Sequence, residues 1–491
     1  MIAQLWTAVL LGIAALGSGA GVASVVTRRL PVPPATRIAL IGAGGLAVIG
    51  VATLLVGHLL LLGPWLPYGL AGLGVLLGVL ARTELVDAVR AGWRGMARQF
   101  RTYPVPLAAV SLCLAVAAVA TLAPPSRRDE IEYHWPAPLD WAASGGWTDS
   151  PFKHVDGFPF MEIVYTSAAT QGSYVAAHLL HFGAFLTLGF AVAGVAASMG
   201  IRGTGVTAAA ALAMPVVWDS AYAAYNDTPV ATFTVLAVAI VLAAPRESVR
   251  AVVVAGILIA LATSVKPTGI AGIGIIGLVI LLRFLFGDTA VRTPPDRSAP
   301  DARPSVGRLL AQLAVLVAPA TFALIFWSVR QYAYTGFFVD PAFFAEPSAD
   351  ALSRLPDTAQ KVLAPFLPFV SGIIGAGEPW GGRTALVIQL FLIPVLVYVI
   401  WRRGAVLRRT MLMLVPAWAH WILLGFRIVR TRFHVASWAL MVVAVRIGVE
   451  DFARRHPRAR FWLEAAWTVC ILLGLVDVSF EMFRHIRAMW G

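Results

Sequence analysis

The sequence has 491 residues, of which 59% are hydrophobic, and its mean hydropathy is +0.79. Soluble domains contain about 45–50% apolar residues, so this composition excludes a soluble globular protein. The formal net charge of +13 comes from 38 Lys and Arg that are spread through the chain, which is typical of membrane-protein loops and does not indicate a nucleic-acid partner. Because the apolar runs are long and unbroken, they predict an all-α polytopic membrane protein with one large helical bundle and not a β-barrel.

Apolar segments along the chain predict about fourteen transmembrane helices. In chain order they lie at residues 2–26, 38–62, 64–81, 104–124, 174–199, 205–219, 229–244, 251–265, 268–286, 308–328, 384–400, 411–425, 433–449 and 461–480. The first segment lacks a basic region before its apolar run, so we interpret it as a retained helix and not as a cleaved signal peptide. Cys113 and Cys470 each lie inside an apolar segment and are predicted to be buried hydrophobic side chains.

The positively charged residues predict the orientation of this bundle. Most of the 38 Lys and Arg fall in one set of alternating loops, and the positive-inside rule places that set in the cytoplasm. Both termini are then extracytoplasmic, as are two long loops at residues 125–173 and 329–383. We predict four parts. Residues 1–103 form extra N-terminal transmembrane helices, and residues 104–286 form a core with the first outer loop. Residues 287–307 form a flexible cytoplasmic linker, and residues 308–491 form a C-terminal half.

The first outer loop concentrates polar side chains in the stretch SRRDEIEYHWPAPLDWAASGGW at residues 126–147. Such a cluster at a membrane edge predicts a functional site. We predict that Asp129 or Glu130 acts as a general base, because a half-desolvated carboxylate can have a suitable pKa. The alternative is a solvated acidic pair that is offset by the two preceding arginines. Three neighbours are candidates for binding the acceptor or the sugar: Glu132, Tyr133 and His134.

Two further polar positions lie at the predicted outer ends of helices. Asp227, like Asn226 before it, would cap the following helix. Asp227 would also face Asp129 across the bundle, where it would orient an acceptor or hold a divalent cation such as magnesium, calcium or manganese. The carboxylates are few, so no metal site is predicted. Lys266, at the turn of an apolar hairpin, would contact either lipid headgroups or a phosphate.

Basic residues that resist the positive-inside bias are candidates for binding a phosphate. Three arginines occur within six residues of the segment GFRIVRTRFHVAS, and guanidinium groups match phosphate oxygens in geometry and charge. The alternative is simple anchoring at the membrane surface. The predicted donor-phosphate residues are Lys266, Arg330, Arg427, Arg430 and Arg432.

The second outer loop contains the glycine-rich segment SGIIGAGEPWGGR, with Glu378 and Trp380 at its centre. Glycine supplies mobility, so this segment would fold over a pocket at membrane level and place Glu378 and Trp380 beside a sugar. The alternatives are a disordered surface loop and an aromatic belt at the interface.

Several motifs, in this order, are similar to one family. The segment DEIEYHWPAPLDWAASGGW resembles the first outer loop of the GT-C glycosyltransferase superfamily, especially its ArnT-like and protein-mannosyltransferase-like bacterial branch. Later segments fit as well: FPFMEIVYTSA, YNDTPVATFTVLAVAIVLAA, SVKPTGIAGIGIIGLVILL, WSVRQYAYTGFFVDPAFF and TRFHVASWALMVVA. The resemblance covers roughly residues 104–450. The chain departs from the family pattern in its three extra N-terminal spans and at Gln331, where the family has asparagine.

The resemblance implies a membrane glycosyltransferase of the cell envelope. Such an enzyme moves a sugar from a polyprenyl-phosphate donor to an acceptor hydroxyl at the extracytoplasmic face, with inversion and without a nucleotide. It implies Asp129 as the base, with Glu130 beside it, and it implies that Lys266 and the turn with Arg430 and Arg432 lie near the donor phosphate. The implied partners are the lipid-linked donor, membrane lipids and an acceptor that is a lipid, a glycan or a protein. No cofactor is required by the resemblance, and a divalent cation stays an open alternative.

Two other classes of function fit a bundle with charged residues. In a lipid or small-molecule transporter or flippase, the same charges would line a translocation path. That function predicts charges near the middle of the bilayer, whereas these residues map to the outer edge. The other alternative is a membrane scaffold that has the fold and no catalytic activity.

Overall fold

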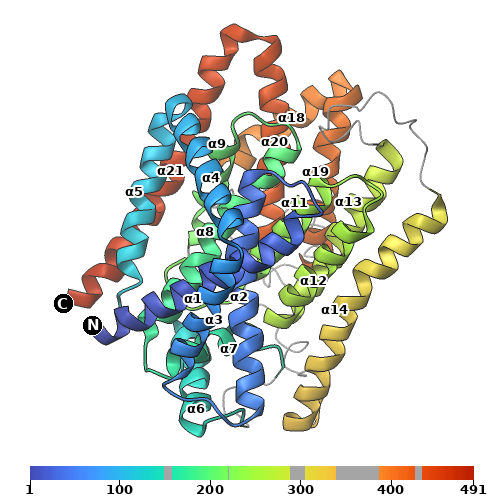
Figure 1. Ribbon diagram of the computed structural model, residues 1–491. Helices are drawn as coiled ribbons and strands as arrows, with labels where there is room; N and C mark the ends of the chain where they lie inside the picture. The colour runs from blue at the N-terminus through green and yellow to red at the C-terminus, as the bar shows by residue number, and fades with distance from the viewer. Residues whose placement is uncertain (149–156, 219–220, 288–304, 339–385, 426–433, 491) are drawn as a thin grey trace, which may run out of the picture.

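The computed structural model describes residues 1–148, 157–218, 221–287, 305–338, 386–425 and 434–490, and all regular secondary structure in these ranges is helical (Figure 1). The first half contains α1 (Ile2–Thr27), α2 (Pro34–His58), α3 (Leu66–Leu80), α4 (Arg82–Thr102), α5 (Pro104–Ala120), η1 (Glu130–His134), α6 (Pro136–Ser144), α7 (Phe160–Ala169), α8 (Tyr174–Ser198), α9 (Thr204–Leu212), α10 (Pro215–Trp218) and α11 (Asp227–Ala243). The second half contains α12 (Val249–Val265), η2 (Pro267–Ala271), α13 (Gly272–Phe286), α14 (Val306–Thr335), α18 (Leu386–Arg402), α19 (Gly404–Gly425), α20 (Val435–Arg455) and α21 (Pro457–Trp490).

Every apolar segment predicted from the sequence coincides with a helix or a pair of helices. Six helices in the described ranges are long and apolar enough to cross a membrane, or up to seven if the bent pair α3 and α4 forms one span. The predicted segment 205–219 is divided into α9 and α10, and the second of these begins at Pro215. The protein is a multi-pass helical membrane protein, and fourteen crossings stay a prediction.

Two helices lie where the sequence was interpreted as loop. Residues 82–102 form α4, although their five arginines indicated a cytoplasmic loop. The predicted outer loop at 125–173 contains η1, α6 and α7, and all ten residues of α7 are buried. The sequence did not locate these helices, because a short or charged helix lacks the long apolar run on which the prediction depended, and the position of these segments outside the membrane stays a prediction.

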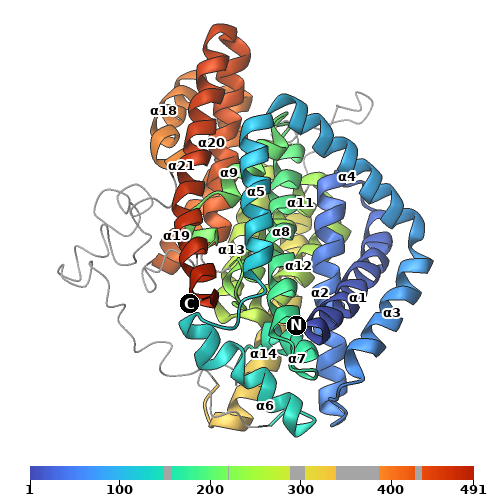
Figure 2. The same cartoon turned by 90° about the vertical axis from the view of Figure 1, so that its left-hand side faces the viewer.

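The core of the bundle is formed by α8, α11 and α20. These helices are apolar around almost their whole circumference and buried along most of their length, as expected for helices in the centre of a membrane bundle. The side chain of Ser173 begins α8 by accepting a hydrogen bond from the backbone N–H of Ala176 at 3.2 Å. In Figure 2, α1, α2 and α3 lie on one side of this core, and α18 to α21 lie on the other.

The N-terminal helices α1, α2 and α3 pack through small residues. A Cβ atom on Gly17 would overlap the backbone of Gly74 in α3, and one on Gly19 would overlap the carbonyl of Ile41 in α2. Close backbone approach at small residues is a common way for helices to associate in a membrane, where no hydrophobic effect drives them together.

Replacing Gly19 with Leu is expected to destabilise the N-terminal helices, because the contacting atoms of Ile41 belong to the backbone and cannot rotate away. We expect the apparent melting temperature in detergent to fall by about 5 °C or more, since overpacking costs about 1–3 kcal/mol or more. Gly12→Leu in the same helix is the control, because no atom lies within 4 Å of a Cβ at that position. Equal melting temperatures for the two variants would contradict this packing.

A buried ionic network lies at the end of the bundle opposite η1. Arg446 of α20 is completely buried, and its guanidinium donates to both carboxylate oxygens of Glu464 at 2.7 and 2.9 Å. Glu450 accepts hydrogen bonds from the backbone N–H groups of Arg202 and Gly203. The network joins α20, α21 and the turn before α9, so the buried charges all have partners.

Candidate functional site

Those polar residues singled out in the sequence that the structure describes gather at one end of the bundle. This end holds η1, α6 and α7 (Figure 2), together with the turn before α11 and the turn that includes η2. Two segments that are far apart in sequence, around Glu130 and around Asp227, meet here.

Glu130 lies at the start of η1 and is almost completely buried, with 1% of its surface exposed. One carboxylate oxygen lies 2.5 Å from His178 Nε2 and accepts a hydrogen bond from the backbone N–H of Ala224 at 2.9 Å. The other oxygen accepts a hydrogen bond from the backbone N–H of Ser126 at 3.1 Å. Burial would raise the pKa of Glu130, but the charge and hydrogen bond of His178, with the two backbone N–H groups, lower it to about 2. Glu130 is therefore a permanently ionised anchor.

His178 of α8 satisfies this anion from the other side. Its Nδ1 lies 3.0 Å from the carbonyl oxygen of Thr121, and its Nε2 faces Glu130. Both ring nitrogens thus face oxygen acceptors. The contact between Glu130 and His178 ties η1 to α8 and to the end of α5.

Replacing Glu130 with Gln is expected to lower the apparent melting temperature at pH 7 by about 5 °C or more, because it removes a buried carboxylate that contacts His178 and accepts two backbone N–H groups. The folded pKa of about 2 lies below the ordinary value of 4.5. The stabilisation by Glu130 is therefore fully present above pH 4.5 and is lost as the pH falls towards 2. Melting curves at pH 7, 5, 4 and 3 should show a shrinking difference between wild type and variant. A difference that stays constant over this range would contradict the assignment.

The neighbours of Glu130 in η1 face different surroundings. Asp129 precedes the helix and is half-buried. Glu132 lies on the surface, where it pairs with the exposed Arg128 at 2.6 Å. His134 is completely buried, its Nδ1 lies 2.5 Å from Glu162 of α7, and its ring packs against Tyr133 and Tyr225. Of the predicted acceptor or sugar residues in η1, only Tyr133 is half-buried.

Lys266 and Asp227 form the second segment of the site. Lys266 ends α12, and its Nζ donates to Asp227 Oδ1 at 2.6 Å and to Asn226 Oδ1 at 3.3 Å. Asp227 begins α11 and has 4% of its side chain exposed, against 17% for Lys266. The Lys266 side chain is therefore less buried than its carboxylate partner.

The contact between the two segments passes through residues 222–225. Ala224 donates its backbone N–H to Glu130, and Tyr225 lies beside His134. Arg127 donates to the hydroxyl of Tyr222 and lies over the Tyr222 ring. Because Asn226 and Asp227 follow Tyr225 directly, Glu130 holds the Asp129 segment next to the Lys266 segment.

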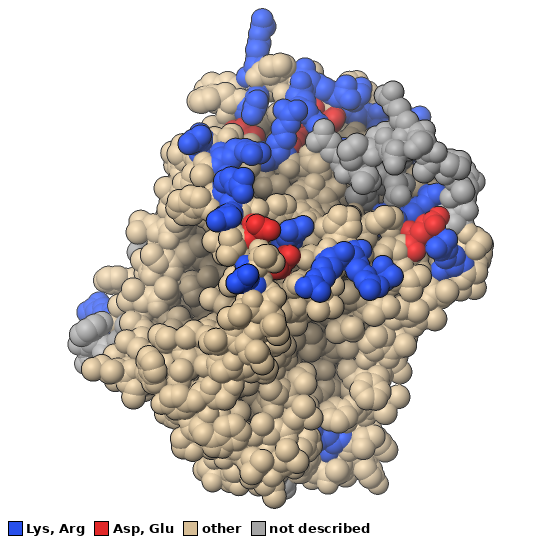
Figure 3. Space-filling view, viewed as in Figure 1, with Lys and Arg blue, Asp and Glu red and all other residues tan. Residues whose placement is uncertain are grey.

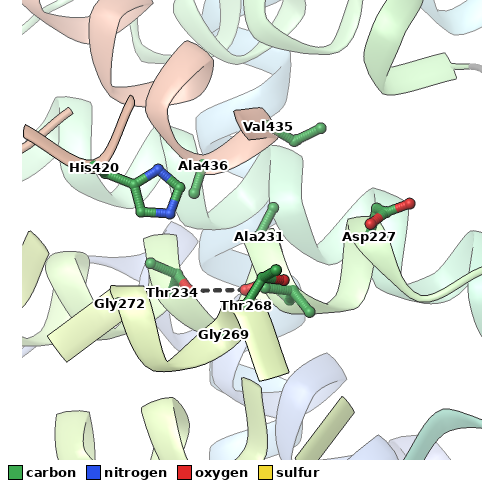
Figure 4. A pocket seen from close by; sticks show the side chains of 10 residues that line it. Asp227, Ala231, Thr234, Thr268, Gly269, Gly272, His420, Val435 and Ala436 are labelled. Carbon is green, nitrogen blue, oxygen red and sulfur yellow. Dashed lines mark hydrogen bonds between the residues drawn. The ribbon is translucent and has the colours of Figure 1, made fainter. Parts of the chain in front are cut away.

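A small pocket, with room for about one water molecule, lies beside Asp227 between α11, η2, α13, α19 and α20. Figure 4 shows the side chains of Thr234, Thr268 and His420 around it, with Asp227 at one margin. The backbone approaches closely at Gly269 and Gly272, where a Cβ would clash with α12. The pocket combines an apolar wall with a few polar groups.

Of the four arginines that were predicted to bind the donor phosphate, the structure describes Arg330. Arg427, Arg430 and Arg432 lie outside the described residues, as do Glu378 and Trp380. The segment that contains the three arginines ends at His434, whose ring lies 5.8 Å from that of His420 at the pocket. Arg330 of α14 lies over the rings of Trp141 and Tyr334, with centroid distances of 5.8 and 4.8 Å.

Several residues at this end were not singled out from the sequence. They are buried and polar: Glu162, Tyr165, His178, His181 and His420. Tyr165 donates to the carbonyl of Tyr225 at 2.6 Å and lies 2.9 Å from His181 Nδ1, so these residues support the turn before Asp227. The available signal was an ionisable residue inside an apolar segment, which by itself indicates a functional or structural role in a membrane protein. Among the described residues, no group of three or more His, Cys, Asp and Glu side chains is arranged to hold a metal ion.

Comparison with solved structures shows the fold. The chain is similar to the crystal structure of ArnT from Cupriavidus metallidurans bound to undecaprenyl phosphate, with a TM-score of 0.50, 17% sequence identity and coverage of 77% of each chain. No protein-family model matches the sequence, and no curated protein matches it. At this level of identity the similarity concerns the fold. It confirms the fold that the motif order implied: the chain has a fold similar to that of ArnT.

Proposed function

We propose that this protein is a membrane glycosyltransferase that moves a sugar from a polyprenyl-phosphate donor to an acceptor hydroxyl. The fold is that of ArnT, whose crystal structure holds undecaprenyl phosphate. The observation that carries the proposal is the contact of Glu130 with Ala224, which joins the segment that contains Asp129 to the turn that leads to Asp227 and its partner Lys266. A carboxylate and an ammonium group at one end of the bundle are the two charges that this reaction needs.

Asp129 is the residue that we assign as the general base, in preference to Glu130. Both oxygens of Glu130 are occupied by hydrogen-bond donors, and its pKa of about 2 makes it a weak base. Asp129 is half-buried at the start of η1, so a substrate can reach it. Glu130 is then a positioning residue for Asp129.

In the proposed reaction, the Asp129 carboxylate accepts the proton of the acceptor hydroxyl. The hydroxyl oxygen forms a bond to the anomeric carbon while the bond between that carbon and the donor phosphate oxygen breaks. The bond electrons leave with the polyprenyl phosphate, and the transition state resembles an oxocarbenium ion, as in glycoside chemistry. A single displacement inverts the configuration at the anomeric carbon.

Lys266 stabilises the departing phosphate in this proposal. Its ammonium is held at 2.6 Å from Asp227, and a preorganised charge costs no reorganisation as the negative charge develops. The small pocket between α11, α13 and α20 lies beside this pair and has an apolar wall, and a lipid donor would have to widen it on binding.

A transfer assay with the full-length protein tests the proposal. The purified protein is incubated in detergent with a panel of polyprenyl-phosphate sugars and with membrane lipids or glycans as acceptors. We expect transfer from at least one donor, and we expect NMR of the product to show an inverted anomeric configuration. Retention of configuration would contradict the single displacement. The absence of transfer from every donor, together with lipid movement across proteoliposome membranes, would favour the transporter.

A further inference from the structure

The helix α4 has three faces of different chemistry, because positions three or four apart lie on one side of a helix. The first face is turned towards the bundle and contains Leu85, Ala88 and Gly92. The second face is exposed and apolar, and it contains Val86, Val89, Trp93 and Met96. The third face is exposed and basic, and it contains Arg90, Arg94, Arg98 and Arg101.

The first face fixes α4 to the bundle at the end opposite η1. Ala88 is completely buried, and Glu84 accepts a hydrogen bond from the hydroxyl of Thr27 at 2.9 Å. Gln99 donates to the carbonyl of Arg202 at 2.9 Å and accepts from the backbone N–H of Gly205 at 3.1 Å. The helix is thus a rigid platform across the ends of α1 and α9.

The direction of α4 differs from that of the helix before it. The bend between α3 and α4 is 82°, and Figure 2 shows α4 running from α3 across the top of the bundle towards α5. The helix α4 therefore turns away from the direction of α3. With 21 residues, it is roughly 31 Å long.

The exposed apolar face of α4 is large for a helix that carries five arginines. Trp93 is 73% exposed and Val89 is 59% exposed. An apolar stripe beside a basic face is typical of helices that lie in the membrane interface, with the apolar side chains among the acyl chains and the basic ones among the headgroups. Figure 3 shows that the Lys and Arg side chains of this face of the molecule gather in its upper half.

The charges on α4 identify the chemistry of the partner. Within the described part of the chain, none of the five arginines of α4 forms an ion pair with an Asp or a Glu side chain. Glu84 faces Thr27, so Asp87 is the acid that is left on the outer faces. We propose that α4 is an interfacial helix that binds the anionic lipid headgroups of the leaflet at this end of the bundle. The negative charge of such headgroups complements the positive charge of the arginines, and basic residues near a membrane surface are attracted to anionic lipids.

The affinity for phosphatidylglycerol tests whether the arginines of α4 bind anionic lipid headgroups. Native mass spectrometry of the full-length protein, titrated with phosphatidylglycerol in phosphatidylcholine micelles, gives the affinity for the anionic lipid. The triple variant Arg90→Gln, Arg94→Gln, Arg98→Gln should bind phosphatidylglycerol about tenfold more weakly. The matched control is Arg250→Gln, Arg458→Gln, Arg460→Gln, which removes the same charge from exposed positions on other helices. The proposal predicts at most about a threefold loss there.

An equal loss in the two triple variants would show a general effect of net charge and would overturn the proposal, as would no loss in either. The melting temperature of each variant checks that it is folded. Because the substituted arginines are exposed, both variants should melt at the same temperature as the wild type.

The depth of position 93 in the membrane tests whether the exposed apolar face of α4 lies among the acyl chains. Nitroxide labels are placed in full-length protein in vesicles of phosphatidylcholine with phosphatidylglycerol, at Trp93→Cys and, as the comparison, at Arg90→Cys; the native Cys113 and Cys470 are buried. The label at position 93 should collide more often with oxygen and the label at position 90 more often with a water-soluble nickel chelate. A label at position 93 that is as accessible to the chelate as the one at position 90 would overturn the proposal.

Discussion

Replacing Asp129 with Asn is expected to lower the rate constant of sugar transfer by about a thousandfold, because the amide cannot accept the proton of the acceptor hydroxyl. The shape of the side chain and its half-buried position before η1 are retained. Binding of the donor should therefore change little. The effect is measured as kcat in the detergent transfer assay, with the affinity for a polyprenyl phosphate measured separately by calorimetry.

The control for this variant is Asp140→Asn in α6, which removes one carboxylate from the same outer segment. We expect its rate constant to stay within about twofold of the wild type, since surface changes away from a site have small effects. Transfer that survives Asp129→Asn unchanged would exclude Asp129 as the base. A loss of donor affinity equal to the loss of rate would make Asp129 a binding residue instead.

Replacing Lys266 with Met is expected to lower the rate constant by about a hundredfold to a thousandfold, because the developing charge on the donor phosphate loses its nearest described cation. The change leaves the buried Asp227 without its partner at 2.6 Å, so part of the loss would reflect stability. The double variant Lys266→Met, Asp227→Asn separates the two effects, since it removes both charges. It should recover melting temperature and not transfer.

Recovery of transfer in the double variant would mean that Lys266 acts only as the counter-ion of Asp227. The matched control is Arg128→Gln, which removes a positive charge at the same end of the bundle from a side chain that is 84% exposed. A surface pair of this kind contributes little, so its rate should remain near that of the wild type.

The helical fold could be predicted from the sequence because each long apolar run has one stable solution in a bilayer. The helices α4 and α7 could not be located from the sequence, for two different physical reasons. In α4 the arginines hide a helix whose stability depends on contacts with Thr27 and Arg202. In α7 the helix is ten residues long, and its burial depends on neighbours that sequence periodicity does not reveal.

The site could be predicted in part. The sequence identified Asp129, Glu130, Asp227 and Lys266 as polar positions at helix ends, and the structure brings their segments together. The sequence did not show how Asp129 and Glu130 differ, because the difference comes from the contacts of Glu130 with His178 and with the backbone N–H of Ala224. Both partners are distant in sequence, and no local pattern specifies them.

The most direct test of the account is a cryo-EM structure of the full-length protein with a polyprenyl-phosphate sugar bound. We predict that the phosphate contacts Lys266, that the lipid enters along the pocket beside Asp227, and that the anomeric carbon faces Asp129 across a gap that an acceptor hydroxyl can fill. A phosphate bound away from Lys266, or a sugar that lies on the far side of η1 from Asp129, would contradict the claim that these residues form one site.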